Sequence, residues 1–114
     1  MYTEFKTLAL EDAAINSRYG LECLFRFFSL SLEKKIIPDV YDDFQRLTIQ
    51  DYNDYQVYGI EKFWAFLKYK SDETPIVIDP LLSSILSQFT CLQDFKNKEL
   101  EFEVSITTFF NTFI

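Results

Sequence analysis

Side chains that commonly bind ligands occur at helical spacing in two segments of this 114-residue chain. At roughly 100° per residue, Arg26, Leu30 and Glu33 share one side of a predicted helix, and Tyr69 falls on the matching side of a second one. An arginine can hold an anion, a carboxylate can accept hydrogen bonds from N–H donors, and an aromatic ring can attract a cation. The pattern indicates a binding surface, and its alternative is a solvated polar face with incidental aromatic residues. Other residues predicted on the same side are Tyr19, Cys23, Tyr58, Lys62 and Ala65.

Catalytic chemistry is not indicated by the sequence. The chain contains no histidine, and it has no nucleophile beside a base, no glycine-rich phosphate loop and no residues at metal-ligand spacing. Cys23 and Cys91 form neither a metal-spaced pair nor a disulfide framework, so we expect both thiols to be reduced. We therefore expect a protein that is not an enzyme and that uses no metal and no cofactor.

The chain is acidic, with 18 acidic and 11 basic residues and a net charge of -7. Because nucleic-acid binding relies on Lys and Arg side chains that neutralise phosphates, any such site must be local. Basic residues do gather late in the two predicted helices, where they would also complement the helix dipole; they are Arg26, Lys34, Lys35, Lys62, Lys68 and Lys70.

The composition gives no indication of a membrane protein. No apolar run approaches the roughly 20 residues that span a bilayer, and charged residues stand where a signal peptide would have its apolar core. We expect no membrane partner and a cytoplasmic location.

The elements that position these residues form an internal repeat. The only two glycines occupy the same phrase, Tyr19-Gly20-Leu21-Glu22 and Tyr58-Gly59-Ile60-Glu61, so the two copies are offset by 39 residues. A period near forty is typical of stacked helical hairpins, in which each unit buries its apolar side against the next. We interpret the glycines as positions where the two helices of a hairpin approach closely. The same offset also aligns Tyr2 with Tyr41, Phe5 with Phe44, Leu8 with Leu47, Asp12 with Asp51, Phe25 with Trp64 and Phe27 with Phe66.

The predicted fold is all-α, with one domain over residues 1–97. Residues 1–39 and 40–78 form two helix-turn-helix repeats, whose apolar stripes have 3.6-residue spacing. Residues 79–97 form C-terminal capping helices, the first beginning with Asp79 as N-cap and Pro80 in the first turn and continuing to about Phe89. A short helical turn is expected around 92–95. The predicted stripes are Leu21, Leu24, Phe25, Phe28 and Leu32, then Ile60, Phe63, Trp64 and Leu67.

Residues 98–114 form an unassigned tail. Phe102, Val104 and Ile106 alternate with polar residues as in a short strand. The tail either packs over the repeats or is unstructured.

Long segments of the chain resemble the C-terminal repeat region of the La-related protein 1 family. The similar segments are LALEDA, RYGLECLFRFFS and LEKK within residues 8–35, and YGIEKFWAFLKY at 58–69. The resemblance implies a HEAT-like array of three repeats that binds the 7-methylguanosine cap and first nucleotide of messages with a 5′-terminal oligopyrimidine tract, and so regulates translation. Two aromatic rings enclose the methylated guanine in the family, a glutamate reads its Watson-Crick edge and arginines hold the phosphates.

The resemblance assigns roles to four residues of this chain. Tyr69 matches one aromatic wall, Glu33 the guanine-reading carboxylate and Arg26 a phosphate-binding arginine. Leu30 stands where the family has the second aromatic wall, a tyrosine, and Ser31 replaces a neighbouring glycine. Because base stacking is worth about 1–3 kcal/mol per ring, we expect weakened binding of the capped mRNA 5′ end.

The chain begins where the second repeat of the family begins. We therefore expect that contacts to the first cytosine are missing, and that the side of the first helix carrying Phe5 and Leu8 is exposed. The alternative function is a helical scaffold for protein partners that has lost cap binding.

Overall fold

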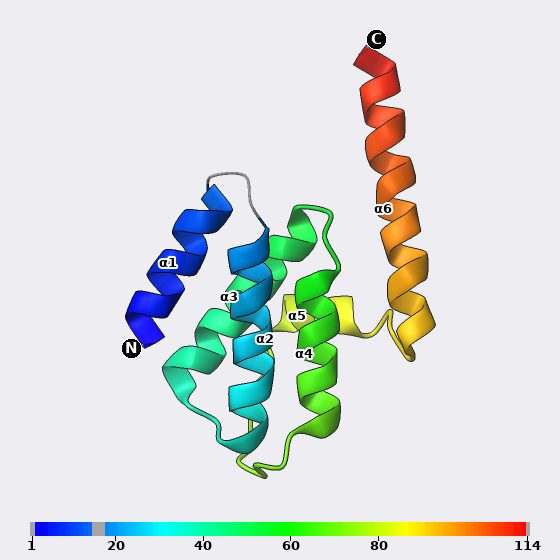
Figure 1. Cartoon of the computed structure of the whole chain (residues 1–114). Coiled ribbons are helices and arrows are strands. Elements are labelled where there is room, and N and C mark those ends of the chain that lie inside the picture. The colour runs from blue at the N-terminus through cyan, green and yellow to red at the C-terminus, as the bar shows by residue number, and fades with distance from the viewer. Residues whose placement is uncertain (1, 15–17, 114) are drawn as a thin grey trace.

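The computed structural model describes residues 2–14 and 18–113, with side chains described for all of these except 12–14 and 105–113. These residues form six helices and no strand, which confirms the all-α prediction (Figure 1). The helices are α1 (Tyr2–Ala14), α2 (Tyr19–Lys34), α3 (Pro38–Asn53), α4 (Tyr58–Tyr69), α5 (Pro80–Leu86) and α6 (Leu92–Phe113). None of these described helices combines the length and apolar composition needed to cross a membrane.

The first four helices form two stacked hairpins, as the 39-residue offset predicts (Figure 1). α1 packs against α2, and α3 packs against α4. The two hairpins meet mainly along α2 and α4, which lie side by side. The second helix of each repeat therefore contributes to one common surface.

The core between the hairpins is largely aromatic. Phe44 of α3 stacks on Phe28 of α2, with ring centroids 5.1 Å apart, and contacts Phe63 of α4 at 4.8 Å. Phe25 and Phe66 are fully buried in the same cluster. Trp64, which the sequence placed in the buried stripe of α4, is only half-buried and contacts Phe95 of α6 instead.

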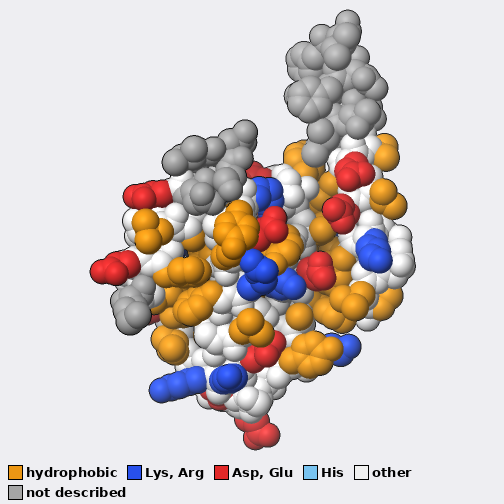
Figure 2. Space-filling view, viewed as in Figure 1, with side chains coloured by type: hydrophobic (Ala, Val, Ile, Leu, Met, Phe, Trp, Pro, Cys, Tyr) orange, Lys and Arg blue, Asp and Glu red, His pale blue; other side chains and the backbone are white. Residues whose placement is uncertain are grey.

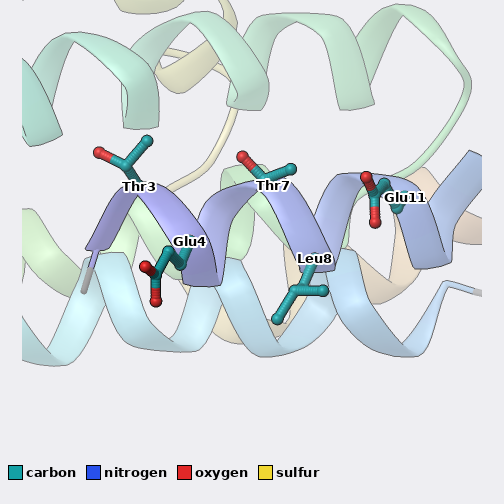
Figure 3. A pocket seen from close by; sticks show the side chains of 5 residues that line it. All are labelled: Thr3, Glu4, Thr7, Leu8 and Glu11. Atoms are coloured by element: carbon teal, nitrogen blue, oxygen red, sulfur yellow. The ribbon is translucent and has the colours of Figure 1, made fainter.

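Equivalent positions of the two repeats differ in burial. Leu47 of α3 is buried, whereas its counterpart Leu8 of α1 is 66% exposed, and Phe5 is also exposed. The reason is that α3 is covered by neighbouring helices, while the outer side of α1 faces away from the other helices. Figure 3 shows the shallow hollow of about 350 Å³ on this side, which is lined by Thr3, Glu4, Thr7, Leu8 and Glu11.

Gly59 lies at a close approach to α3 of its own hairpin, as predicted, and at a still closer approach to α2 of the other hairpin. A Cβ atom at this position would lie 2.8 Å from Cζ of Phe25 and 3.1 Å from Oδ2 of Asp51. The Gly59 N–H instead donates to Oδ2 of the buried Asp51 at 3.0 Å. The glycine thus brings the start of α4 close to both α2 and α3.

The C-terminal part of the chain corrects three expectations. The Asp79 side chain does cap α5, since its Oδ1 accepts from the N–H of Leu81 at 2.9 Å, but α5 ends at Leu86 and not near Phe89. The expected short turn at 92–95 is the beginning of the 22-residue helix α6. The strand suggested by Phe102, Val104 and Ile106 is therefore wrong, and the predicted boundary between residues 97 and 98 falls inside this helix.

Tertiary contacts favour a helix in the first half of α6. Phe95 and Phe102 are separated by two helical turns and so lie on the same side of α6. Phe95 stacks on Phe89 at 4.3 Å, and Phe102 contacts Tyr52 at 5.3 Å. A three-residue alternation is too short to distinguish a strand from this helical pattern.

Candidate functional site

The four residues predicted for the site lie on the joint outer surface of α2 and α4. Arg26 and Leu30 are exposed on α2, Glu33 is partly exposed near its end, and Tyr69 is the last residue of α4. Their orientation follows from the amphipathic pattern of α2, whose opposite side buries Leu24, Phe25, Phe28 and Leu32 in the core. Leu30 is 63% exposed and Tyr69 is 62% exposed, so both side chains are accessible to a ligand.

Backbone hydrogen bonds tie the end of α2 to the segment after α4. The Glu33 carbonyl accepts from the N–H of Ser71 at 2.8 Å and from its Oγ at 2.9 Å. Because Ser71 follows Tyr69 by only two residues, these bonds hold Tyr69 near the last turn of α2. The sequence alone does not predict this link, since a carbonyl acceptor leaves no residue-type signal.

Asp72 strengthens the same connection. Its Oδ2 accepts from the Ile36 N–H at 2.8 Å, and its Oδ1 accepts from the N–H of Thr74 at 2.9 Å. The bonds from Thr74 and Ile36 stabilise the carboxylate and lower the pKa of Asp72 to about 2. The segment after α4 is thus fixed beside α2 while Asp72 is ionised.

Arg26 lies near the beginning of α4. Its Nη2 donates to Sγ of Cys23 at 3.1 Å, and its positive charge interacts with the Tyr58 side chain. Partial burial is the main reason why the pKa of Tyr58 is raised, and Arg26 opposes that shift. The guanidinium remains exposed on the α2 and α4 surface and can still bind an anion.

Two lysines place positive charge over aromatic rings on α4. Nζ of Lys62 lies 5.2 Å from the ring centroid of Tyr58. Nζ of Lys68 lies 5.1 Å from the ring centroid of Trp64 and 5.5 Å from that of Tyr69. Figure 2 shows basic side chains among hydrophobic and acidic ones over α2 and α4, so this surface offers local positive charge although the whole chain is acidic.

Lys68 is a residue that the sequence reasoning did not place in the site. Its four-residue spacing from Trp64 is the signal that predicts a contact on one side of a helix. An ammonium group next to Tyr69 can attract a phosphate, but it also competes with a cationic base for the same ring.

The predicted aromatic sandwich is incomplete. No aromatic ring of the described residues lies against Tyr69, and Leu30 offers an aliphatic surface in place of a second ring. Leucine can cover a base by apolar contact but has no ring quadrupole for a positive charge. No group of three His, Cys, Asp or Glu residues in the described ranges is arranged to hold a metal ion.

Comparison with known proteins agrees with this architecture. Residues 1–93 match the family model described as the LARP1 HEAT repeat region. A search of curated proteins gives no match. The family match covers both hairpins, α5 and the surface that carries Arg26, Leu30, Glu33 and Tyr69, and it stops within the first turn of α6. The chain therefore belongs to the LARP1 HEAT repeat family.

Proposed function

We propose that the α2 and α4 surface binds the capped 5′ end of mRNA in the cytoplasm and contributes to translational regulation without catalysis. The observation that carries the proposal is that one accessible surface displays Arg26, Leu30, Glu33 and Tyr69, the positions matching the cap-binding residues implied by the family resemblance.

Each side chain has a distinct part in the proposed complex. Tyr69 stacks on the methylated guanine, and Leu30 covers the other side of the base by apolar contact. The Glu33 carboxylate accepts hydrogen bonds from the N1 and N2 donors of the base. Arg26 binds the phosphates, with Lys62 and Lys68 adding positive charge nearby.

The proposal is tested by titrating the protein with 7-methyl-GTP. Trp64 is a suitable fluorescent reporter because it contacts Lys68 and lies on the same helix as Tyr69. We expect saturable binding that weakens when Glu33→Gln removes the charged acceptor. Glu103→Gln, an exposed change of the same kind on α6, is the control. No saturable signal at millimolar 7-methyl-GTP would contradict the proposal.

A second candidate function is a scaffold for protein partners. Its specific support is the outer side of α1, where the exposed Leu8 lines the hollow shown in Figure 3. Exposed apolar patches of this kind often mark protein contacts. Sedimentation and pull-down experiments on wild type and on Leu8→Glu test this function, which predicts a partner that is lost in the variant. A partner retained by Leu8→Glu would contradict a contact through this side of α1.

A further inference from the structure

A cavity of about 170 Å³ lies where the beginning of α2, the turn between α3 and α4, and α6 come together. Six of its lining residues are Arg18, Glu22, Tyr55, Tyr58, Glu61 and Glu99. The cavity adjoins the start of α2, at the opposite end of that helix from Glu33. Glu99 lies beyond the residues that match the family model, so α6 completes a site that the family match does not contain.

The cavity carries negative charge that the protein itself does not neutralise. Nη1 of Arg18 pairs with Oδ1 of Asp51 at 3.1 Å, and its Nε lies 3.7 Å from Oε2 of Glu22. Arg18 is therefore already balanced by its own neighbours. No described basic side chain lies within ion-pair distance of Glu61 in α4 or Glu99 in α6. Figure 2 shows acidic side chains along this part of the surface, between α4 and α6.

Two tyrosine rings border the same space. Tyr55 is 53% exposed, and its ring packs edge-on against Phe102 of α6 at 5.5 Å. The Tyr58 ring is supported by Phe25 at 6.4 Å. Because Nζ of Lys62 already lies 5.2 Å from the Tyr58 ring centroid, the ring available to a ligand is that of Tyr55. An exposed electron-rich ring in one cavity with the carboxylates of Glu61 and Glu99 is a suitable environment for an organic cation.

A buried hydrogen-bond donor is also left without an acceptor. Nη2 of Arg18 is inaccessible to solvent and has no partner among the described residues. A buried donor without a partner costs about 1–3 kcal/mol. The other Arg18 nitrogens pair with Glu22 and Asp51, so this buried atom provides no donor for a ligand in the cavity.

We propose that this cavity binds an arginine side chain in a peptide segment of a protein partner. The planar guanidinium donates to Glu61 and Glu99 and stacks on the Tyr55 ring, which a lysine ammonium does less well. RNA is a poor occupant because its phosphates would be repelled by the carboxylates. This site adjoins the proposed cap surface at Tyr58, but its test uses a peptide and does not depend on cap binding.

The test is an NMR titration of the isotope-labelled full chain with the capped tripeptide acetyl-Gly-Arg-Gly-amide. We expect saturable shifts at the amides of Gln56, Val57 and Glu61, which line or adjoin the cavity. The same peptide with citrulline, which keeps the shape but lacks the charge, should bind at least fivefold more weakly. Glu61→Gln and Glu99→Gln should each weaken binding about two- to fivefold, the range expected for a partly exposed ion pair.

Glu103→Gln is the matched control, because Glu103 is exposed on α6 and does not line the cavity. Its affinity for the arginine peptide should equal that of wild type. The proposal is wrong if the citrulline peptide binds equally well, if Glu99→Gln behaves as Glu103→Gln does, or if the arginine peptide gives no saturable shifts at millimolar concentration. It is also wrong if a short RNA, and not the peptide, shifts the same amides.

Discussion

The Gly59 N–H and the Asp51 carboxylate form a buried hydrogen bond of 3.0 Å that joins the beginning of α4 to the end of α3. Burial raises the pKa of Asp51, while the bonds from Gly59 and Arg18 oppose that rise. The glycine is required because any side chain would occupy the space of Phe25 and Asp51. The residue that marks the repeat in the sequence is thus a packing residue.

Gly59→Ala should lower the free energy of unfolding by about 1–2 kcal/mol. The added Cβ would lie 2.8 Å from Cζ of the fully buried Phe25, and this overpacking outweighs the better helix propensity of alanine. Urea unfolding followed by circular dichroism measures the change. Ala65→Gly in the same helix is the control for propensity alone, and a Gly59→Ala variant as stable as wild type would contradict the packing role.

Acid should weaken the connection between α2 and the segment after α4. Because the pKa of Asp72 is lowered from its ordinary value of 3.8 to about 2, its ionised form stabilises the folded state above pH 3.8. That contribution is lost as the pH falls through about 2. Thermal unfolding of wild type and Asp72→Asn should therefore differ at pH 6 and converge at low pH. A difference that stays constant with pH would exclude this linkage.

Phe102→Ala should detach the middle of α6. The ring contacts Tyr52 at 5.3 Å and Tyr55 at 5.5 Å, and aromatic pairs contribute about 0.5–1.5 kcal/mol beyond their buried area. A helix that projects from its neighbours has little stability of its own, so helical circular dichroism should also decrease. Val104→Ala changes an exposed residue of α6 and should alter stability by less than about 0.5 kcal/mol. Equal effects of the two variants would contradict docking through Phe102.

Arg26→Gln should weaken binding of a capped oligonucleotide and reduce its salt dependence. If Arg26 neutralises one phosphate, the slope of log affinity against log salt concentration should become shallower by about 0.7, the value for one contact to single-stranded nucleic acid. Arg46→Gln, an exposed arginine of α3 outside the α2 and α4 surface, should leave the slope unchanged. An unchanged slope for Arg26→Gln would show that Arg26 does not contact phosphate.

The repeat architecture could be predicted because its signals are local in sequence. The duplicated phrase around Gly20 and Gly59 indicates the hairpins, and the 3.6-residue stripes indicate most of the buried side of α2. Asp79 followed by Pro80 gives a correct helix start, because capping depends on neighbouring residues.

The remaining features depend on tertiary contacts that no local pattern contains. Phe102 packs on Tyr52, far away in the sequence, and this contact favours a helix where alternation suggested a strand. The sequence similarly predicts which side of α2 presents Glu33, but not that the Glu33 carbonyl binds Ser71 and thereby fixes the segment after Tyr69. The cavity near Tyr55 is equally unpredictable, because its lining comes from three separate parts of the chain.

The most direct measurement of the proposed cap surface is the affinity of Leu30→Tyr for 7-methyl-GTP, compared with wild type by fluorescence titration. Leu8→Tyr is the matched control, because Leu8 is similarly exposed but lies on α1. A second ring contributes about 1–3 kcal/mol of stacking, so Leu30→Tyr should bind about ten- to a hundredfold more tightly while Leu8→Tyr matches wild type. If Leu30→Tyr binds 7-methyl-GTP no more tightly than Leu8→Tyr, the proposed base site between residues 30 and 69 is contradicted.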